Sequence, residues 1–147
     1  MKYKTLFITL SFTIAQSAFA FNAEEKPEAC TSVKAIQAES VNHVVRESSR
    51  GGLIALGSDN HYGTKEVWKF GIMLYGDYDN EQAFLEVSKK AVKALKPYVY
   101  GPEKANDGHW FCMYSADGAI GQAITPPDEP TLTQVISRFY RVQNIKV

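Results

Sequence analysis

The chain has 147 residues, a length typical of one domain. Its 16 Lys and Arg residues balance 16 Asp and Glu residues, so no net charge would draw nucleic acid or an anionic membrane surface. A hydrophobic fraction of 45% with 12% aromatic residues is typical of a packed globular core and argues against a disordered chain. We therefore expect a single globular domain that binds no nucleic acid.

The first twenty residues have the three parts of an export signal. Two lysines give a positive start, residues 6–15 are an apolar stretch that also contains threonine and serine, and Ala18 and Ala20 supply the small side chains of a signal peptidase site. The stretch is short for a permanent span of a bilayer about 30 Å thick, although an uncut N-terminal anchor is the alternative. We expect an exported protein, periplasmic or secreted, with residues 1–20 as signal peptide and no membrane span after cleavage.

Cys30 and Cys112 are the two cysteines of the chain. Exported compartments permit disulfides, and this pairing would close a loop of about 83 residues. His109 precedes Cys112 by three residues in a predicted strand, so the two side chains face opposite sides and do not share a metal ion. We favour a Cys30–Cys112 disulfide over free or metal-bound thiols.

The segment that follows the signal allows two arrangements. Residues 21–29 are charged and contain a proline, which predicts a flexible lead-in. The apolar spacing of residues 31–47 fits one long amphipathic helix, or a helix near 31–38 followed by a strand near 40–47. We favour helix plus strand, because the valines of the second half are poor helix formers.

Two strands separated by a turn-rich loop are expected next. Residues 53–56 form a short apolar run, and residues 57–64 are dense in turn formers. Over residues 67–75, one set of alternate positions is large and apolar, which predicts a strand. The other set is mixed, so we expect the sheet to be covered on one side only.

Residues 79–96 have the clearest helical pattern, with apolar residues recurring every three to four positions. Asp79 is the expected N-cap, with Gln82 as the matching residue of a capping box. Pro97 ends the helix, because proline lacks the N–H that the helix needs.

The last third of the chain predicts a hairpin and a tail. We expect a loop over 101–108, a strand over 109–114, a hairpin turn at 116–118 and a returning strand over 119–125. Prolines 126, 127 and 130 argue against regular structure directly afterwards, and residues 128–147 are expected to be a C-terminal tail that is partly helical.

This order of elements predicts an α+β fold, a small antiparallel sheet with a helix packed on one face, cross-linked by one disulfide. The single α+β domain is expected over residues 30–127.

Motifs that would identify an enzyme are missing from the sequence. It contains no nucleotide-binding glycine motif, no H-E-x-x-H and no nucleophile elbow. Ser58-Asp59-Asn60 lacks the S-x-x-K and K-T-G partners of penicillin-recognising enzymes. Residues 77–81 begin like a calcium loop but are not followed by its glycine and closing glutamate. We expect neither an enzyme nor a metal site, and a small hydrolase has the least support.

The aromatic residues indicate a ligand more than any motif does. Several tyrosines lie in polar loops, and clefts lined by aromatic side chains bind apolar, planar molecules. Ferric haem accepts His, Tyr and Met as axial ligands. The candidate ligand-binding residues are His61, Tyr62, Tyr98, Tyr100, His109 and Met113. The alternative is that these side chains complete the edge of a small core.

Several motifs occur together along residues 30–127. They are C-x-S-V-x-x-I (30–36), Y-x-T-x-x-x-W-x-F-x-I (62–72), G-P (101–102), C-x-Y (112–114) and A-I-T-P-P (123–127). The set resembles a family of small exported bacterial proteins of unknown function, some of which are labelled hemin-binding proteins. The resemblance implies hemin binding or iron acquisition, and the two cysteines of that family match Cys30 and Cys112.

The expected function is therefore an exported small binding protein for hemin or a similar apolar, planar ligand, held in an aromatic-lined cleft between helix and sheet. This hypothesis predicts that His61, Tyr62 and Tyr98 converge on one concavity. The alternative is a non-enzymatic accessory protein, periplasmic or secreted, whose exposed aromatic residues bind another protein.

Overall fold

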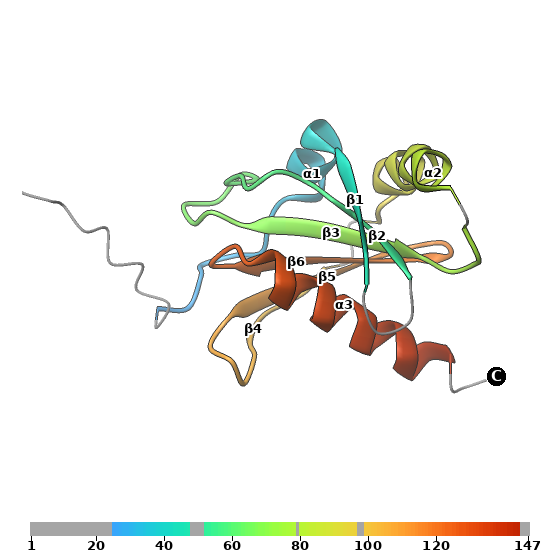
Figure 1. The fold of residues 1–147 in the computed structure, drawn as a ribbon. Helices are drawn as coiled ribbons and strands as arrows, with labels where there is room; N and C mark the ends of the chain where they lie inside the picture. The colour runs from blue at the N-terminus through green and yellow to red at the C-terminus, as the bar shows by residue number, and fades with distance from the viewer. Residues whose placement is uncertain (1–24, 48–51, 79, 97–98, 145–147) are drawn as a thin grey trace, which may run out of the picture.

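A computed structural model describes residues 25–47, 52–78, 80–96 and 99–144, with side chains up to residue 138. The predicted signal peptide, Tyr98 and Asp79 lie outside these ranges. Within them, the helices are α1 (Val33–Glu39), α2 (Glu81–Lys93) and α3 (Glu129–Asn144), and the strands are β1 (His43–Arg46), β2 (Leu53–Leu56), β3 (Lys69–Leu74), β4 (Val99–Lys104), β5 (Trp110–Ala116) and β6 (Ala119–Thr125). The strands form one antiparallel sheet in the order β1-β2-β3-β6-β5-β4, which confirms the α+β fold class (Figure 1).

The helix-plus-strand interpretation of residues 31–47 is confirmed. The Ser32 side chain accepts a hydrogen bond from the Ala35 N–H at the start of α1. At its end, Ser40 has a φ of 62° and donates its N–H to the Ile36 carbonyl at 2.7 Å. This left-handed residue turns the chain sharply, so that Val41 becomes buried and β1 begins two residues later.

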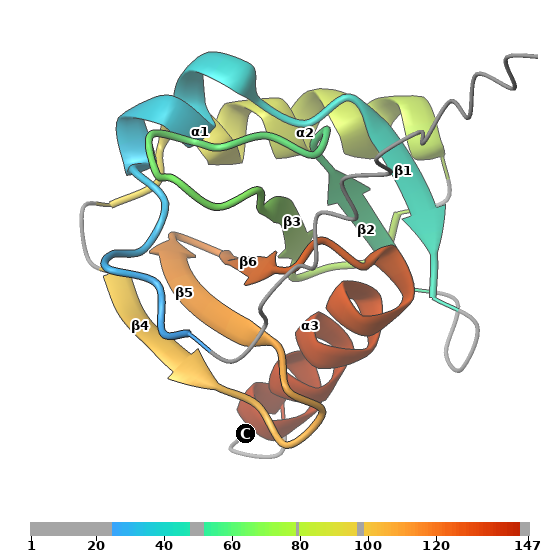
Figure 2. The same ribbon diagram turned by 90° about the vertical axis from the view of Figure 1, so that its left-hand side faces the viewer.

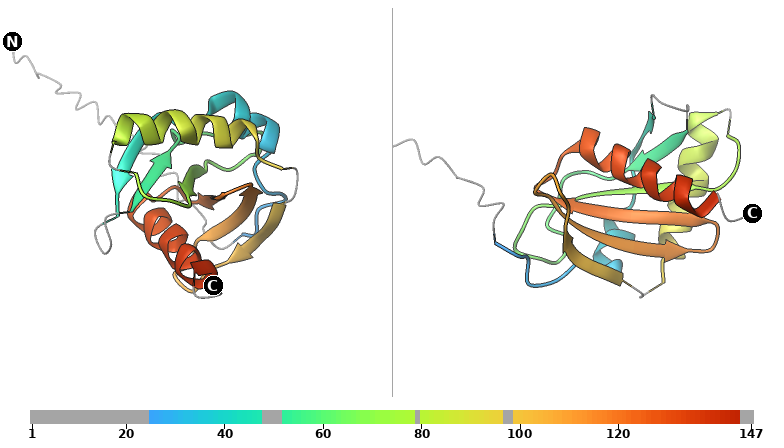
Figure 3. Two further views of the ribbon diagram at one scale, coloured as in Figure 1. Left: turned by 90° about the vertical axis from the view of Figure 1, so that its right-hand side faces the viewer. Right: turned by 90° about the horizontal axis from the view of Figure 1, so that it is seen from below.

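Helices cover both faces of the sheet, and the expectation of one covered side is wrong. Figure 1 shows α1 and α2 above the sheet and α3 below it, and both panels of Figure 3 place α3 on the face away from α2. Two buried clusters result, one around Trp68 and Phe70 and the other around Ile124, Leu132 and Ile136. The mixed face of β3 is covered because Gly71 on that face leaves room for Leu132 and Ile136 of α3.

The fourth strand in chain order, β4, replaces part of the loop expected over residues 101–108. β4 pairs with β5 at Tyr100 and again at Glu103, with a register shift between these two residues. The Gly101-Pro102 pair indicated a loop, but β4 is the last strand of the sheet, and an edge strand tolerates proline at an irregularity.

The proline-rich segment is also shorter than expected, because Pro130 lies in the first turn of α3. Proline fits there, since the N–H groups of the first turn have no partner within the helix. Asp128 provides the cap, as its carboxylate accepts a hydrogen bond from the Thr131 N–H at 3.3 Å. For α2 the cap is Asn80, whose side-chain oxygen accepts from the Ala83 N–H, rather than the expected Asp79.

The predicted disulfide between Cys30 and Cys112 is present, with a Cα–Cα distance of 5.8 Å. It ties the segment before α1 to the third residue of β5. Directly beside it, the Tyr114 hydroxyl donates to the Thr31 carbonyl at 2.9 Å and contacts the Thr31 hydroxyl.

Among the residues described, no helix combines the length and the hydropathy needed to cross a bilayer.

Candidate functional site

His61 and Tyr62 are adjacent in the β2–β3 loop, but only His61 reaches solvent. The His61 Nδ1 atom lies 3.0 Å from the carbonyl oxygens of both Lys65 and Glu66, so the ring stays close to its own loop. The Tyr62 side chain is 2% exposed, and its hydroxyl donates to the Ser58 carbonyl at 2.6 Å. Burial, aided by two nearby carboxylates, raises the pKa of Tyr62 to about 12.

Tyr62 is held in the core on the side of α1. It packs in the same buried cluster as Ile36 and Trp68, and its carbonyl accepts from the Ser32 N–H at 3.0 Å. Its backbone is left-handed, with a φ of 45°. The ring and the hydroxyl of Tyr62 are thus both engaged with the protein, which explains why a tyrosine stands in a polar loop.

Tyr100 and Met113 lie on the opposite face of the sheet. They are cross-strand partners in β4 and β5. Cys112 and Tyr114 belong to the cluster under α1 and α2, whereas Phe111 packs against the cluster under α3. Because side chains alternate along a strand, Met113 and its partner Tyr100 share the α3 side with Phe111. Tyr100 is 49% exposed there.

His109 lies at the turn between β4 and β5. Its Nδ1 atom is 3.3 Å from the Asp107 Oδ1 atom, and the same oxygen accepts from the His109 N–H at 3.1 Å. The His109 carbonyl accepts from the Ala105 N–H at 2.7 Å, which closes the turn. The imidazole is 19% exposed and lies beside this carboxylate, but its buried Nδ1 atom makes no hydrogen bond within the described residues.

A groove of about 480 Å³ runs between α3 and the β4–β5 turn, and we refer to it as the α3–β5 groove. Figure 2 shows this turn and α3 on the same side of the sheet. The residues that line the groove are Ala105, Asn106, Asp107, Phe111, Thr131, Gln134, Val135 and Arg138. It combines an aromatic ring and an aliphatic side chain with a cation on one wall and a carboxylate on the other.

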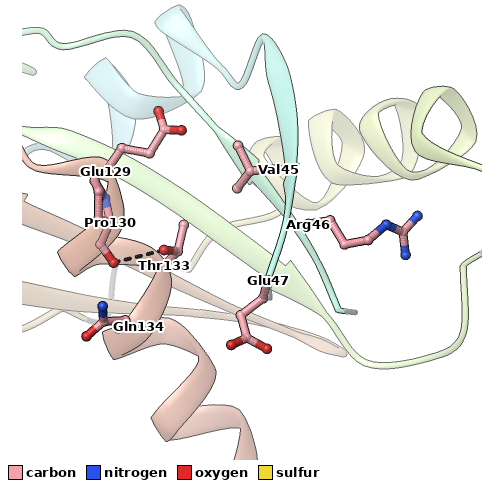
Figure 4. Close-up of a pocket in the computed structure, with 7 residues that line it drawn as sticks. All are labelled: Val45, Arg46, Glu47, Glu129, Pro130, Thr133 and Gln134. Carbon is pink, nitrogen blue, oxygen red and sulfur yellow. Dashed lines mark hydrogen bonds between the residues drawn. The ribbon is translucent and has the colours of Figure 1, made fainter. Parts of the chain in front are cut away.

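A smaller groove of about 290 Å³ lies on the other flank of α3, against β1, and we refer to it as the α3–β1 groove. Figure 4 shows the residues that line it, which are Val45, Arg46, Glu47, Glu129, Pro130, Thr133 and Gln134. Ion pairs cross its upper end, where the Glu129 carboxylate lies 3.4 Å from His43 Nε2 and 3.6 Å from Lys69 Nζ. This groove is more polar than the α3–β5 groove.

The structure divides the candidate residues between the two sheet faces. Tyr62 lies with α1, Tyr100 and Met113 face the α3 side, and His109 contacts a residue of the α3–β5 groove. The convergence of His61, Tyr62 and Tyr98 on one concavity stays a prediction, since Tyr98 lies outside the described residues.

Sequence reasoning did not select the residues that make the α3–β5 groove apolar and cationic, namely Phe111, Val135 and Arg138. All three line the groove beside α3, and the expectation of a partly helical tail did not predict that this helix packs on the sheet. The apolar repeat after residue 131 is the signal that could have found them, because an amphipathic helix requires a surface to cover.

Within the described ranges, no group of three or more His, Cys, Asp or Glu side chains could hold a metal ion. No protein-family model, curated protein or solved structure matches the chain. The site is therefore defined by its own geometry, which offers an apolar floor and charged walls for binding.

Proposed function

We propose that this chain is an exported small binding protein for hemin or a similar flat, apolar ligand that carries carboxylates. The observation that carries the proposal is the α3–β5 groove, whose volume of about 480 Å³ is in the range of small-molecule sites. The groove lies between a helix and the sheet and has an aromatic residue in its lining. The sequence motifs that resemble exported hemin-binding proteins support the same class of ligand.

The lining of the groove suits an amphiphilic ring system. Phe111 and Val135 offer apolar contact to a flat surface. Arg138 is exposed and makes no ion pair within the described part of the chain, so its guanidinium is available to a ligand carboxylate. A porphyrin with carboxylates at one edge would satisfy both kinds of contact.

His109 is the histidine best placed to bind the iron of such a ligand. A histidine that binds a metal commonly donates its second ring N–H to a carboxylate, and the Nδ1 atom of His109 lies 3.3 Å from the Asp107 Oδ1 atom, without a hydrogen bond between them in this structure. Asp107 also lines the groove. None of the three histidines is among the residues that line the groove, and His109 adjoins it through Asp107.

The test is an absorbance titration of the purified, disulfide-bonded protein with hemin. We expect a saturable, one-to-one shift of the Soret band, with weaker binding in Arg138→Ala and an altered spectrum in His109→Ala. His61→Ala is the matched control, because this exposed histidine lies in the β2–β3 loop, and we expect it to bind hemin like the unmodified protein. A shallow, non-saturating response would overturn the proposal, and an effect confined to His61→Ala would overturn this location of the site.

Export is part of the same proposal. It is supported by the pattern of the first twenty residues and by the Cys30–Cys112 disulfide, since disulfides persist in oxidising compartments. The mass of the protein recovered from the periplasm or medium tests it. Cleavage after Ala20 predicts a chain that begins at Phe21, and recovery of the uncut chain in the cytoplasm would contradict export.

A second candidate function is that of an accessory protein that binds another protein. The observation that favours it is the position of β1 at the end of the sheet, with the α3–β1 groove alongside. An extended segment of a partner adds readily to an edge strand, with its side chains in neighbouring grooves. A photo-crosslinking residue at Val45 would then capture one partner in the envelope, whereas the same residue at Gln82 on α2 would not. Equal capture at both positions would contradict this function.

A further inference from the structure

Gln122 is a buried polar residue without a partner. Its side chain is 0% exposed in the middle of β6, and neither its Nε2 nor its Oε1 atom makes a hydrogen bond within the described part of the chain. A primary amide offers two donors and an acceptor, and leaving them unpaired in a protein interior is unfavourable. An aliphatic side chain would serve packing better at this position, so the amide requires an explanation.

Gln122 lies on the sheet face that α3 covers, next to the floor of the α3–β5 groove. Its neighbour across to β5 is Met113, and Phe111 of the groove lies one pair farther along the same face. Its neighbour across to β3 is Gly71, above which Leu132 and Ile136 of α3 pack. A ligand that extends from the groove along β5 would therefore contact Gln122 once α3 has moved away from the sheet.

Polar contacts hold the first turn of α3. Glu129 is paired with Lys69, whose side chain is only 11% exposed, and Asp128 caps the helix. Leu132 at the end of this turn and Ile136 in the next turn are buried apolar contacts, and a groove lies on each flank of the helix. Movement of α3 about its first turn would uncover Gln122 while the ion pair stays closed.

We propose that Gln122 is a ligand-positioning residue of the α3–β5 groove, whose amide N–H donates to a carboxylate of a flat, apolar ligand once α3 has moved away from β6. This inference rests on the proposed function and adds to it the group that selects the ligand. The apolar plane lies along Phe111, and the carboxylate accepts a hydrogen bond from the Gln122 amide. Binding satisfies the unpaired amide, so affinity depends on the carboxylate and not on the plane alone.

The test compares hemin with its dimethyl ester, which has the same plane and iron but no free carboxylate. Gln122→Leu removes the amide with little change in size, and Gln82→Leu on the exposed face of α2 is the matched control. We expect Gln122→Leu to weaken hemin binding about tenfold or more and to leave binding of the ester unchanged. The control should bind both probes like the unmodified protein.

The outcomes separate this inference from the proposed function. If the unmodified protein binds neither probe saturably, the proposed function fails. If it binds hemin and Gln122→Leu binds hemin equally well, or loses affinity for both probes alike, the function stands and the role of Gln122 is overturned.

A second measurement covers the case in which Gln122→Leu does not fold. In the unmodified protein, diamagnetic zinc protoporphyrin should shift the two side-chain amide proton resonances of Gln122, and those of Gln82 should stay in place. Unmoved Gln122 resonances at saturating zinc protoporphyrin would overturn the proposal.

Discussion

Gly71 of β3 lies directly under Ile136 of α3, so closely that a Cβ atom on Gly71 would come within 3.0 Å of the Ile136 Cδ1 atom. The same Cβ would be 2.8 Å from Leu56 Cδ2 and 3.2 Å from Leu132 Cδ2. This close approach allows a helix to cover the second face of the sheet. It also fixes the height of α3 above Gln122 and above the floor of the α3–β5 groove.

Gly71→Ala should therefore destabilise the protein by about 1–3 kcal/mol, because the added methyl group overpacks a close contact between helix and sheet. The measurement is the free energy of unfolding from urea titrations. Gly52→Ala is the control, since a Cβ there would meet only the Met73 Cε atom at an ordinary 3.4 Å. Equal stability of the two variants would show that α3 does not depend on this contact.

The disulfide should contribute more than any single packing contact. Linking residues 82 apart removes chain entropy from the unfolded state, on the order of 4–5 kcal/mol in the simple loop model. A large drop in the urea midpoint is expected after reduction with dithiothreitol. The double variant Cys30→Ser, Cys112→Ser should have the same urea midpoint as the reduced protein, and dithiothreitol should not change that midpoint. A reduced protein as stable as the oxidised one would contradict this prediction.

Buried tyrosines should make the fold sensitive to alkali. Burial raises the pKa of Tyr62 from 10 to about 12, and burial likewise raises the pKa of Tyr114 above its ordinary value. The unfolded chain loses these protons first, so the stabilisation is complete below pH 10 and is lost as the pH rises toward 12. The free energy of unfolding should fall with pH over this window, by at most about 1.4 kcal/mol per pH unit for each tyrosine.

Tyr62→Phe isolates one of these groups. The variant should lose roughly 1 kcal/mol at pH 7, because the hydrogen bond to the Ser58 carbonyl is removed, and its stability should fall less steeply above pH 10. Urea titrations at pH 7, 9, 10 and 11 measure both effects. Tyr100→Phe is the control, since Tyr100 is half exposed. Parallel pH curves for Tyr62→Phe and the unmodified protein would refute the assignment.

Asn80→Ala should lower the free energy of unfolding by about 1 kcal/mol. The Asn80 side-chain oxygen caps α2 by accepting a hydrogen bond from the Ala83 N–H at 3.0 Å, and the variant loses this bond. Asp79→Ala provides the comparison, since the sequence pattern predicted the cap one residue earlier. The two free energies of unfolding distinguish these positions. A larger loss of unfolding free energy in Asp79→Ala than in Asn80→Ala would support the capping box predicted from the sequence and contradict the Asn80 cap.

The parts of the fold that sequence predicted correctly are those whose cause is local. The alternation over residues 67–75 identifies a strand, and the turn at residues 116–118 identifies a hairpin with a returning strand, because side-chain period and backbone freedom act between near neighbours. The helix over residues 79–96 is predicted for the same reason, although its first residues are assigned wrongly. The disulfide is predicted because two cysteines in a chain with the pattern of an export signal have one possible intramolecular pairing.

Tertiary structure decided what depends on distant residues. β4 exists because β5 supplies its hydrogen-bonding partners, which offsets the Gly101-Pro102 interruption. The candidate ligand residues were chosen for their chemistry, but strand register places Tyr100 and Met113 on one sheet face while the β2–β3 loop buries Tyr62 on the other.

The α3–β5 groove is likewise a tertiary product, since Phe111 and Arg138 meet only after α3 has packed over Gly71. The sequence by itself determined the type of most elements and the covalent cross-link, but not the edge strand β4. Which faces meet, and so where a ligand can bind, was decided by packing between segments far apart in the chain, and no local pattern encodes such contacts.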